Sequence, residues 1–118
     1  MRAQSPAMEE AYRKLSLALI ADGYTLETAN PTKHELATGW RALKEIEESA
    51  SNIDQRNGGQ SRIEVKMSQR GRLYNVVIIP MLRYGGGAEQ VAGAHHPLME
   101  KWQRIVRTLL ENEYREED

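Results

Sequence analysis

Three histidines come closest to a metal-binding set in this chain. His95 and His96 are adjacent, and His34 lies far from them in the sequence. Adjacent side chains in an extended segment point to opposite sides, so the pair does not converge on one ion. The 118 residues include no cysteine, which excludes disulfides, zinc thiolate sites and thiol catalysis. We therefore predict no metal and no cofactor, and interpret His95 and His96 as polar loop residues before a helix that starts near Pro97.

Other residue types capable of catalysis form no recognisable arrangement. Gly85-Gly86-Gly87 follows an apolar segment, but no Lys-Ser/Thr pair follows it and its spacing matches neither phosphate-binding pattern. No serine stands in a Gly-x-Ser-x-Gly turn, and no two acidic residues stand out as an acid/base pair. The sequence predicts no catalytic residues and no enzymatic activity, unless folding assembles a site from distant positions.

A run of basic residues is the strongest electrostatic signal. Between positions 62 and 83 five basic residues face one acidic residue, a local excess of +4 on a chain of net charge −1 and pI about 6.3. Such a surface attracts phosphates, anionic headgroups or an acidic protein. The absence of Phe and the ordinary pI disfavour nucleic acid, and the alternative is a solvated face of a half-buried hairpin. The anion-binding candidates are Arg62, Lys66, Arg70 and Arg72.

A second candidate surface combines aromatic and aliphatic residues. Such residues anchor protein or ligand contacts when they lie on a sheet face that helices leave uncovered. The competing interpretation makes Trp40 and Trp102 core residues of helix-on-sheet packing. The partner-binding candidates are Trp40, Tyr74, Val76, Ile78 and Tyr84.

Two helices are expected to flank the segments that carry these residues. Residues 6–22 place apolar side chains at three- and four-residue steps, with Pro6 at the start and Gly23 at the end. A second helix beginning near Pro97 has an apolar seam that includes Trp102 and Leu109. Each apolar stripe needs a surface to pack against.

The period changes to two between the helices, which predicts strands. We expect strands over residues 24–29, 35–46, about 62–68 and 73–83, with a tight turn at 69–72 and long loops at 47–60 and 85–94. The centre of the fourth strand, residues 76–79, is apolar at every position. We expect Val77 or its neighbours to meet the helices, and the alternate residues Val76 and Ile78 to lie on the other face.

These elements predict a single domain over residues 1–118. Its fold is α+β, a two-layer sandwich in which an antiparallel four-stranded sheet carries the N- and C-terminal helices on one face, in the order α-β-β-β-β-α. Hydrophobic residues at 40% and charged residues at 28% suit one globular core. No apolar run reaches the roughly 18 residues of a membrane span, and residues 1–5 lack a signal peptide's apolar stretch. We expect a chain that neither crosses a membrane nor carries its own export signal.

Three features of the sequence stand in a particular order: a helix followed by Gly23-Tyr24, then Leu36-Ala37-Thr38-Gly39-Trp40, then Arg62-Ile63-Glu64-Val65. With the strands and the terminal helix, this arrangement over about residues 12–110 resembles small bacterial envelope lipoprotein domains, in particular those of BamC-type lipoproteins. The resemblance implies a non-catalytic domain in the periplasm or outer envelope that binds envelope proteins and is anchored by a lipidated cysteine. That cysteine would lie upstream of Met1, because the chain has none. Without the resemblance, we expect a cytoplasmic protein.

The leading hypothesis is a binding or structural module that contacts a protein partner or a second copy of itself. One alternative is a binder of small apolar ligands, with a cavity between sheet and helix lined by methionines. Another is a binder of nucleic acid or anionic surfaces through the basic hairpin. The methionines considered for the cavity are Met8, Met67, Met81 and Met99.

Overall fold

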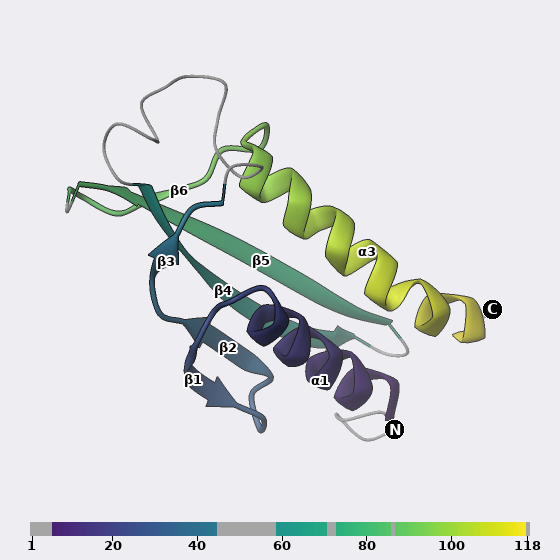
Figure 1. Ribbon diagram of the computed structural model, residues 1–118. Coiled ribbons are helices and arrows are strands. Elements are labelled where there is room, and N and C mark those ends of the chain that lie inside the picture. The colour runs from purple at the N-terminus through teal and green to yellow at the C-terminus, as the bar shows by residue number, and fades with distance from the viewer. Residues whose placement is uncertain (1–5, 45–58, 71–72, 86, 118) are drawn as a thin grey trace.

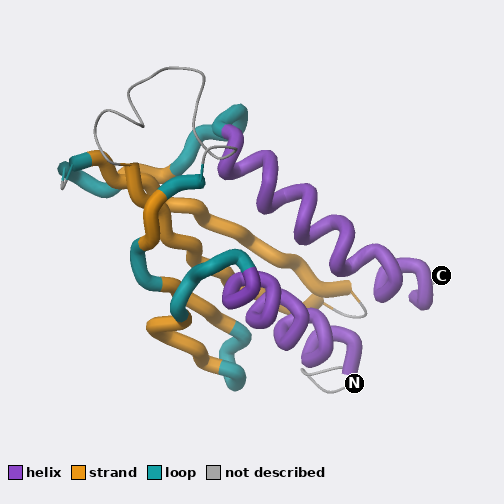
Figure 2. Tube along the Cα trace, viewed as in Figure 1, coloured by secondary structure: helices purple, strands orange, loops and turns teal. Residues whose placement is uncertain are grey.

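The chain forms an α+β structure in which two helices accompany an antiparallel sheet (Figures 1 and 2). The structure is a computed structural model and describes residues 6–44, 59–70, 73–85 and 87–117. Its elements are α1 (Pro6–Ala21), β1 (Leu26–Asn30), β2 (Glu35–Thr38), β3 (Arg41–Ala42), β4 (Gly59–Arg70), β5 (Leu73–Tyr84), β6 (Gln90–Val91) and α3 (Pro97–Glu117).

The two helices occupy the predicted positions. In α1 the residues of the apolar stripe are buried, among them Met8, Leu15 and Leu19. The helix ends where Gly23 takes a φ of 97°, a left-handed conformation that glycine adopts without a steric penalty. α3 begins at Pro97 as expected, and its side chains of Leu98 and Trp102 are fully buried.

The sheet has more strands than the four predicted. Its order is β1-β2-β4-β5-β6, with β3 pairing to β4 beyond the end of β2, and every pairing is antiparallel. The predicted strand over 35–46 is interrupted at Gly39 and Trp40, which separate β2 from β3. β6 falls within the predicted loop 85–94, where its two residues pair with Met81 and Leu82. The predicted loop 47–60 lies mostly outside the described residues.

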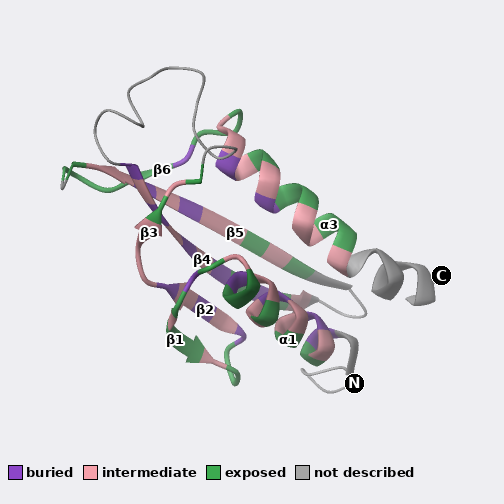
Figure 3. Cartoon of the chain, in the orientation of Figure 1, coloured by how far each residue is buried: buried purple, intermediate pink, exposed green. Residues whose placement is uncertain are grey.

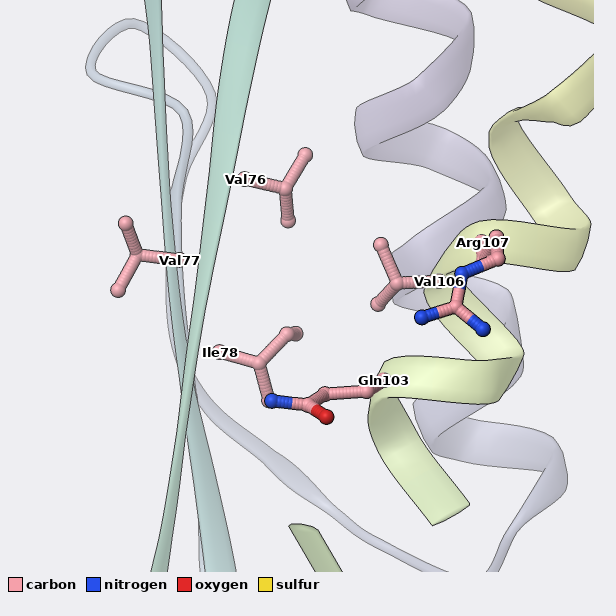
Figure 4. Close-up of a pocket in the computed structure, with 6 residues that line it drawn as sticks. All are labelled: Val76, Val77, Ile78, Gln103, Val106 and Arg107. Atoms are coloured by element: carbon pink, nitrogen blue, oxygen red, sulfur yellow. The ribbon is translucent and has the colours of Figure 1, made fainter. Parts of the chain in front are cut away.

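The register of the β4–β5 hairpin corrects the predicted orientation of β5. In β4 the buried residues are Ile63, Val65 and Met67, and Val65 lies opposite Ile78 while Met67 lies opposite Val76. Residues opposite each other in a ladder share a face, so Val76 and Ile78 point toward the helices and Val77 points away, as Figure 4 shows. The sequence-based assignment of these faces was wrong.

Both helices lie on the same face of the sheet and share one hydrophobic core with it (Figures 1 and 3). The most buried side chains come from α1, β2, β4 and α3, which places the core between the helices and the central strands. The molecule is elongated, 50 × 26 × 22 Å, because the long β4–β5 hairpin and α3 run along its length. The fully or nearly buried core residues are Met8, Ala11, Leu15, Leu19, Tyr24, Leu36, Ile63, Val65, Met67, Leu82, Ala92, Leu98 and Trp102.

An ion cluster ties the end of α1 to both β3 and α3. The Asp22 carboxylate accepts hydrogen bonds from Arg41 at 2.6 Å, from Lys44 at 2.8 Å and from Lys101 at 3.0 Å. Burial by itself would raise the pKa of Asp22, but these three cations outweigh it and hold the pKa below its usual 3.8. Next to this cluster the Tyr24 hydroxyl is hydrogen-bonded to the Ser61 hydroxyl at 2.6 Å.

Among the described helices, neither has the length and apolar character that a transmembrane segment requires.

Candidate functional site

The sheet face opposite the helices, which we call the outer face, carries the most exposed apolar residues of the sheet. The register that buries Ile63, Val65 and Met67 directs the intervening residues of β4 and their partners on β5 to this face. It also brings Val91 of β6 beside Met81. We define the outer patch as Trp40, Arg62, Val77, Ile79, Met81, Arg83 and Val91.

Trp40 is the aromatic centre of the outer patch. The Arg83 guanidinium lies over its ring at 4.1 Å from the centroid, and the Arg62 guanidinium lies 5.8 Å from the same centroid. The Arg83 side chain is held in place by Gln60, whose Oε1 accepts hydrogen bonds from Nη2 at 2.8 Å and from Nε at 3.2 Å. Arg62 is in turn ion-paired with Glu64. These contacts hold two cations close to an indole that stays partly exposed to solvent.

A strip of aliphatic side chains continues the outer patch along β5 and β6. Val77 is 50% exposed and Val91 is 58% exposed, and both fractions are far above those of the core residues. Ile79 and Met81 lie between them on the same face and are half-buried. Apolar side chains that remain accessible in a row on a sheet face are typical of surfaces that contact another protein.

A groove lies between β5 and α3 on the helix side of the sheet. Its volume is about 590 Å³, and Figure 4 shows Val76 and Ile78 directed toward Val106 of α3 across it. Polar groups at its side come from Gln103 and Arg107. We call this the edge groove and define it by its six lining residues, Val76, Val77, Ile78, Gln103, Val106 and Arg107.

The predicted partner-binding residues therefore divide between two surfaces. Trp40 belongs to the outer patch, whereas Val76 and Ile78 line the edge groove and are half-buried. Tyr84 shares the helix-side face of β5 with them, because it lies opposite Gly59 in the register. The side chain of Tyr74 lies outside the described residues. Each remains a candidate, but the single surface expected from the sequence is not formed.

The structure describes the side chains of two of the four predicted anion-binding residues. Arg62 and Lys66 lie on the outer face, and Arg62 is already engaged by Glu64 and Trp40. Arg72 and the side chain of Arg70 lie outside the described residues. The methionines proposed for a cavity are also separated, since Met8 and Met67 are core residues while Met81 lies on the outer face.

Two of the histidines, His34 and His96, make hydrogen bonds within the fold, whereas His95 is exposed. His34 is buried, adopts a φ of 56° in the turn between β1 and β2, and its Nε2 lies 3.0 Å from Glu9 Oε2 of α1. His96 Nδ1 accepts a hydrogen bond from the Leu98 amide at the start of α3. Within residues 6–44, 59–70, 73–85 and 87–117, no three metal-ligating side chains converge.

Sequence reasoning missed Val77, Ile79 and Val91 as surface residues, and Gln103 and Arg107 as groove residues. For Val77 and Ile79 the signal was present, because a tight two-residue turn between the strands would pair odd-numbered residues of β4 with even-numbered residues of β5, as the register does. Val91 had no such signal, since β6 has only two residues. The groove residues have no local signature, since they come from a helix and a strand that only the tertiary fold brings together. In comparisons with known proteins, no protein-family model matches the chain, and no curated protein matches it in sequence.

Proposed function

We propose that this protein is a non-catalytic structural module that assembles with a second copy of itself through the outer patch. The observation that carries the proposal is the row of accessible apolar side chains, ending in the Arg83–Trp40 stack, on the sheet face that no described helix covers. Tryptophan and arginine are the residues that most often dominate binding energy at protein interfaces. Their side chains here are already held in one arrangement, which lowers the entropy lost on association.

The charges on the outer face favour a second copy over a partner of one charge. Lys66 lies opposite Glu35 in the register of β4 and β2, and Arg62 is paired with Glu64, so cations and anions are interspersed. In a twofold dimer the same surface meets itself, and a surface with both signs can satisfy its own copy. Two such faces would pack as a sandwich, the usual way in which sheets bury their apolar sides.

The experiment compares the oligomeric state of three purified proteins by size-exclusion chromatography with light scattering. Val77→Lys places a charge in the outer patch, and Leu17→Lys is the matched control because Leu17 is 53% exposed on α1, away from the sheet. We expect a dimer for the wild type and Leu17→Lys, and a monomer for Val77→Lys. Circular dichroism checks that all three are folded.

Two results would contradict this proposal. The first is a wild-type protein that stays monomeric at the highest accessible concentration, because it does not self-assemble. A dimer that Leu17→Lys disrupts as much as Val77→Lys depends on a surface other than the outer patch.

The location is a separate part of the proposal. The resemblance to BamC-type domains supports a place in the bacterial envelope, reached through a lipid anchor upstream of Met1. Fractionation of the full-length gene product in its source cells tests this directly, because an anchored envelope protein sediments with membranes and is released by detergent. Recovery in the soluble cytoplasmic fraction would contradict the envelope location and leave the assembly proposal intact.

A further inference from the structure

Among the described residues, one edge of β5 is unpaired over most of its length. On the side away from β4, among the described residues, β5 pairs with β6 at Met81 and Leu82 and with no other strand. β5 begins at Leu73, so its first eight residues lack a strand partner on that side within the described part of the chain. The backbone of an unpaired edge offers its N–H and C=O groups to an additional strand.

The Pro80 carbonyl identifies which residues direct their backbone groups toward this edge. It accepts a hydrogen bond from the Ala92 amide at 2.9 Å, on the β6 side of the strand. In an antiparallel ladder every second residue directs both its N–H and its C=O to the same side. Val76 and Ile78 therefore present their backbone groups to the free edge. Pro80 has no N–H. At its position an N–H would point away from β4, so the β4–β5 ladder loses no hydrogen bond.

The edge groove opens along this same stretch of β5. Val76 and Ile78 contribute their side chains to its apolar wall, and Val106 of α3 stands opposite (Figure 4). Val77 also lines the groove although its side chain points to the outer face, so the groove reaches the edge of the strand. Unpaired backbone groups and an apolar wall are the two features that bind an extended peptide by strand addition.

The charge and direction of the groove define the end of such a peptide. Arg107 is the charged residue of the lining, and its guanidinium lies beside Val106 at a level between Val76 and Ile78, while Gln103 lies beside Ile78 (Figure 4). β6 already runs antiparallel to β5 on this edge. A strand that continued the line of β6 would run from Ile78 toward Val76, and it would meet Arg107 between these two residues if it ended there. A carboxylate at its C-terminal end would meet the guanidinium there.

We propose that the edge groove binds an extended peptide as an added strand, antiparallel to β5, with apolar side chains against Val76, Ile78 and Val106 and a carboxylate against Arg107. This goes beyond assembly through the outer patch, because it uses the other face of the sheet and a different ligand. Backbone hydrogen bonds supply the affinity, and the alternate side chains with the terminal carboxylate supply the selectivity.

Fluorescence polarisation with defined peptides tests the proposal. The probe is a labelled six-residue peptide of alternating threonine and valine that ends in aspartate with a free C-terminus, and its counterpart ends in lysine amide. We expect the acidic peptide to bind wild-type protein at least about tenfold more tightly than the lysine peptide. Arg107→Glu should reverse this preference, which loss of folding does not do. A third peptide ends in aspartate amide and keeps only the side-chain carboxylate. Its affinity separates the contribution of the terminal carboxylate from that of the side-chain carboxylate.

Backbone methylation of the acidic peptide tests the strand hydrogen bonds separately, because it leaves the charge of the peptide unchanged. Methyl groups on the amides of one set of alternate residues should abolish binding, and methyl groups on the other set should leave it intact, because an added strand uses every second amide. Equal binding of acidic and lysine peptides, or indifference to the methylated positions, would overturn the proposal.

Two variants separate this proposal from the others. Arg104→Glu is the charge-matched control, because Arg104 lines a different hollow on α3, and it should leave the peptide preference unchanged. Trp40→Ala disrupts the outer patch at a residue that does not line the edge groove, so it should still bind the acidic peptide, and failure of self-assembly does not affect this test. If the protein binds no peptide and Arg107→Glu changes its oligomeric state instead, the edge pairs with a second copy and the peptide proposal is overturned.

Discussion

Both carboxylate oxygens of Asp22 accept hydrogen bonds from the Lys101 ammonium, each at 3.0 Å. The two residues are 79 positions apart in the sequence, so this contact joins the N-terminal part of the chain to its C-terminal helix. Arg41 and Lys44 bind the same carboxylate from the segment at β3. A single acidic side chain therefore links the C-terminal end of α1 to the segment at β3 and to the first turns of α3.

Asp22→Asn should lower the free energy of unfolding at pH 7 by about 1.5–3 kcal/mol, the usual contribution of a hydrogen bond to a charged group. The pKa of Asp22 is lower in the folded protein than its usual 3.8. The stabilisation is therefore fully present above the unfolded pKa and is lost as the pH falls through the folded pKa. Urea unfolding at a series of pH values should show the wild type and the variant converging at acidic pH.

The control for this experiment is Glu10→Gln, which breaks the exposed pair between Glu10 and Arg13. Surface pairs of this kind contribute little to stability, so the variant should match the wild type at every pH. A constant difference between wild type and Asp22→Asn down to strongly acidic pH would show that the charge of Asp22 is not what stabilises the fold.

The exposed and buried leucines of α1 should differ sharply in their effect on stability. Leu15 is fully buried and Leu17 is 53% exposed, although the two are separated by one residue. Leu15→Ala should cost about 2–5 kcal/mol because it leaves a cavity in the core. Leu17→Ala should change the free energy of unfolding by less than about 0.5 kcal/mol. Similar losses for the two variants in chemical denaturation would contradict the described face of α1.

The turn at His34 should tolerate asparagine better than valine. His34 has a φ of 56°, a conformation in which asparagine is common and β-branched residues are strained. Both His34→Asn and His34→Val lose the contact with Glu9. The valine variant should be less stable by about a further 1–2 kcal/mol, the cost of the left-handed conformation. Equal urea midpoints for the two variants would show that the backbone conformation contributes nothing.

The two tryptophans should report different environments. Trp102 is fully buried, whereas Trp40 is half-buried beneath the Arg83 guanidinium on the outer face. Acrylamide should quench part of the wild-type fluorescence, and Trp40→Phe should leave emission that is blue-shifted and protected from the quencher. Trp102→Phe should leave accessible emission. If the outer patch forms the dimer, raising the protein concentration should protect Trp40 as well.

The helices and the buried face of β4 could be predicted from the sequence because their periodicity is local. The stripe through Leu15 and Leu19 and the alternation of Ile63, Val65 and Met67 each fix which side is buried. The bounds of α1 and the start of α3 followed from Pro6, Gly23 and Pro97. The number of strands could not be predicted from such local signals. Gly39 and Trp40 interrupt a continuous alternating pattern, and β6 is too short and too exposed to carry a signal.

The candidate surfaces could be predicted only in part, for a reason that β5 makes clear. Residues 76–79 are apolar at every position, so hydrophobicity does not say which pair faces the helices. The orientation is decided by the pairing with β4, in which Val65 lies opposite Ile78. Arg107 illustrates the remaining difficulty, since on the helix alone it is one of several solvated cations and its role depends on the strand beside it.

The core has a consequence for how the protein is made. Leu98 and Trp102, two of its fully buried side chains, belong to α3, which the ribosome synthesises after every strand of the sheet. Until α3 emerges, the nascent sheet exposes the apolar surface that these residues will cover, and Asp22 lacks Lys101. A long hairpin with an open edge and a bare apolar face is a substrate for chaperones and a template for misassembly. A ribosome stalled before residue 97 would therefore hold an unfinished fold, however complete its strands.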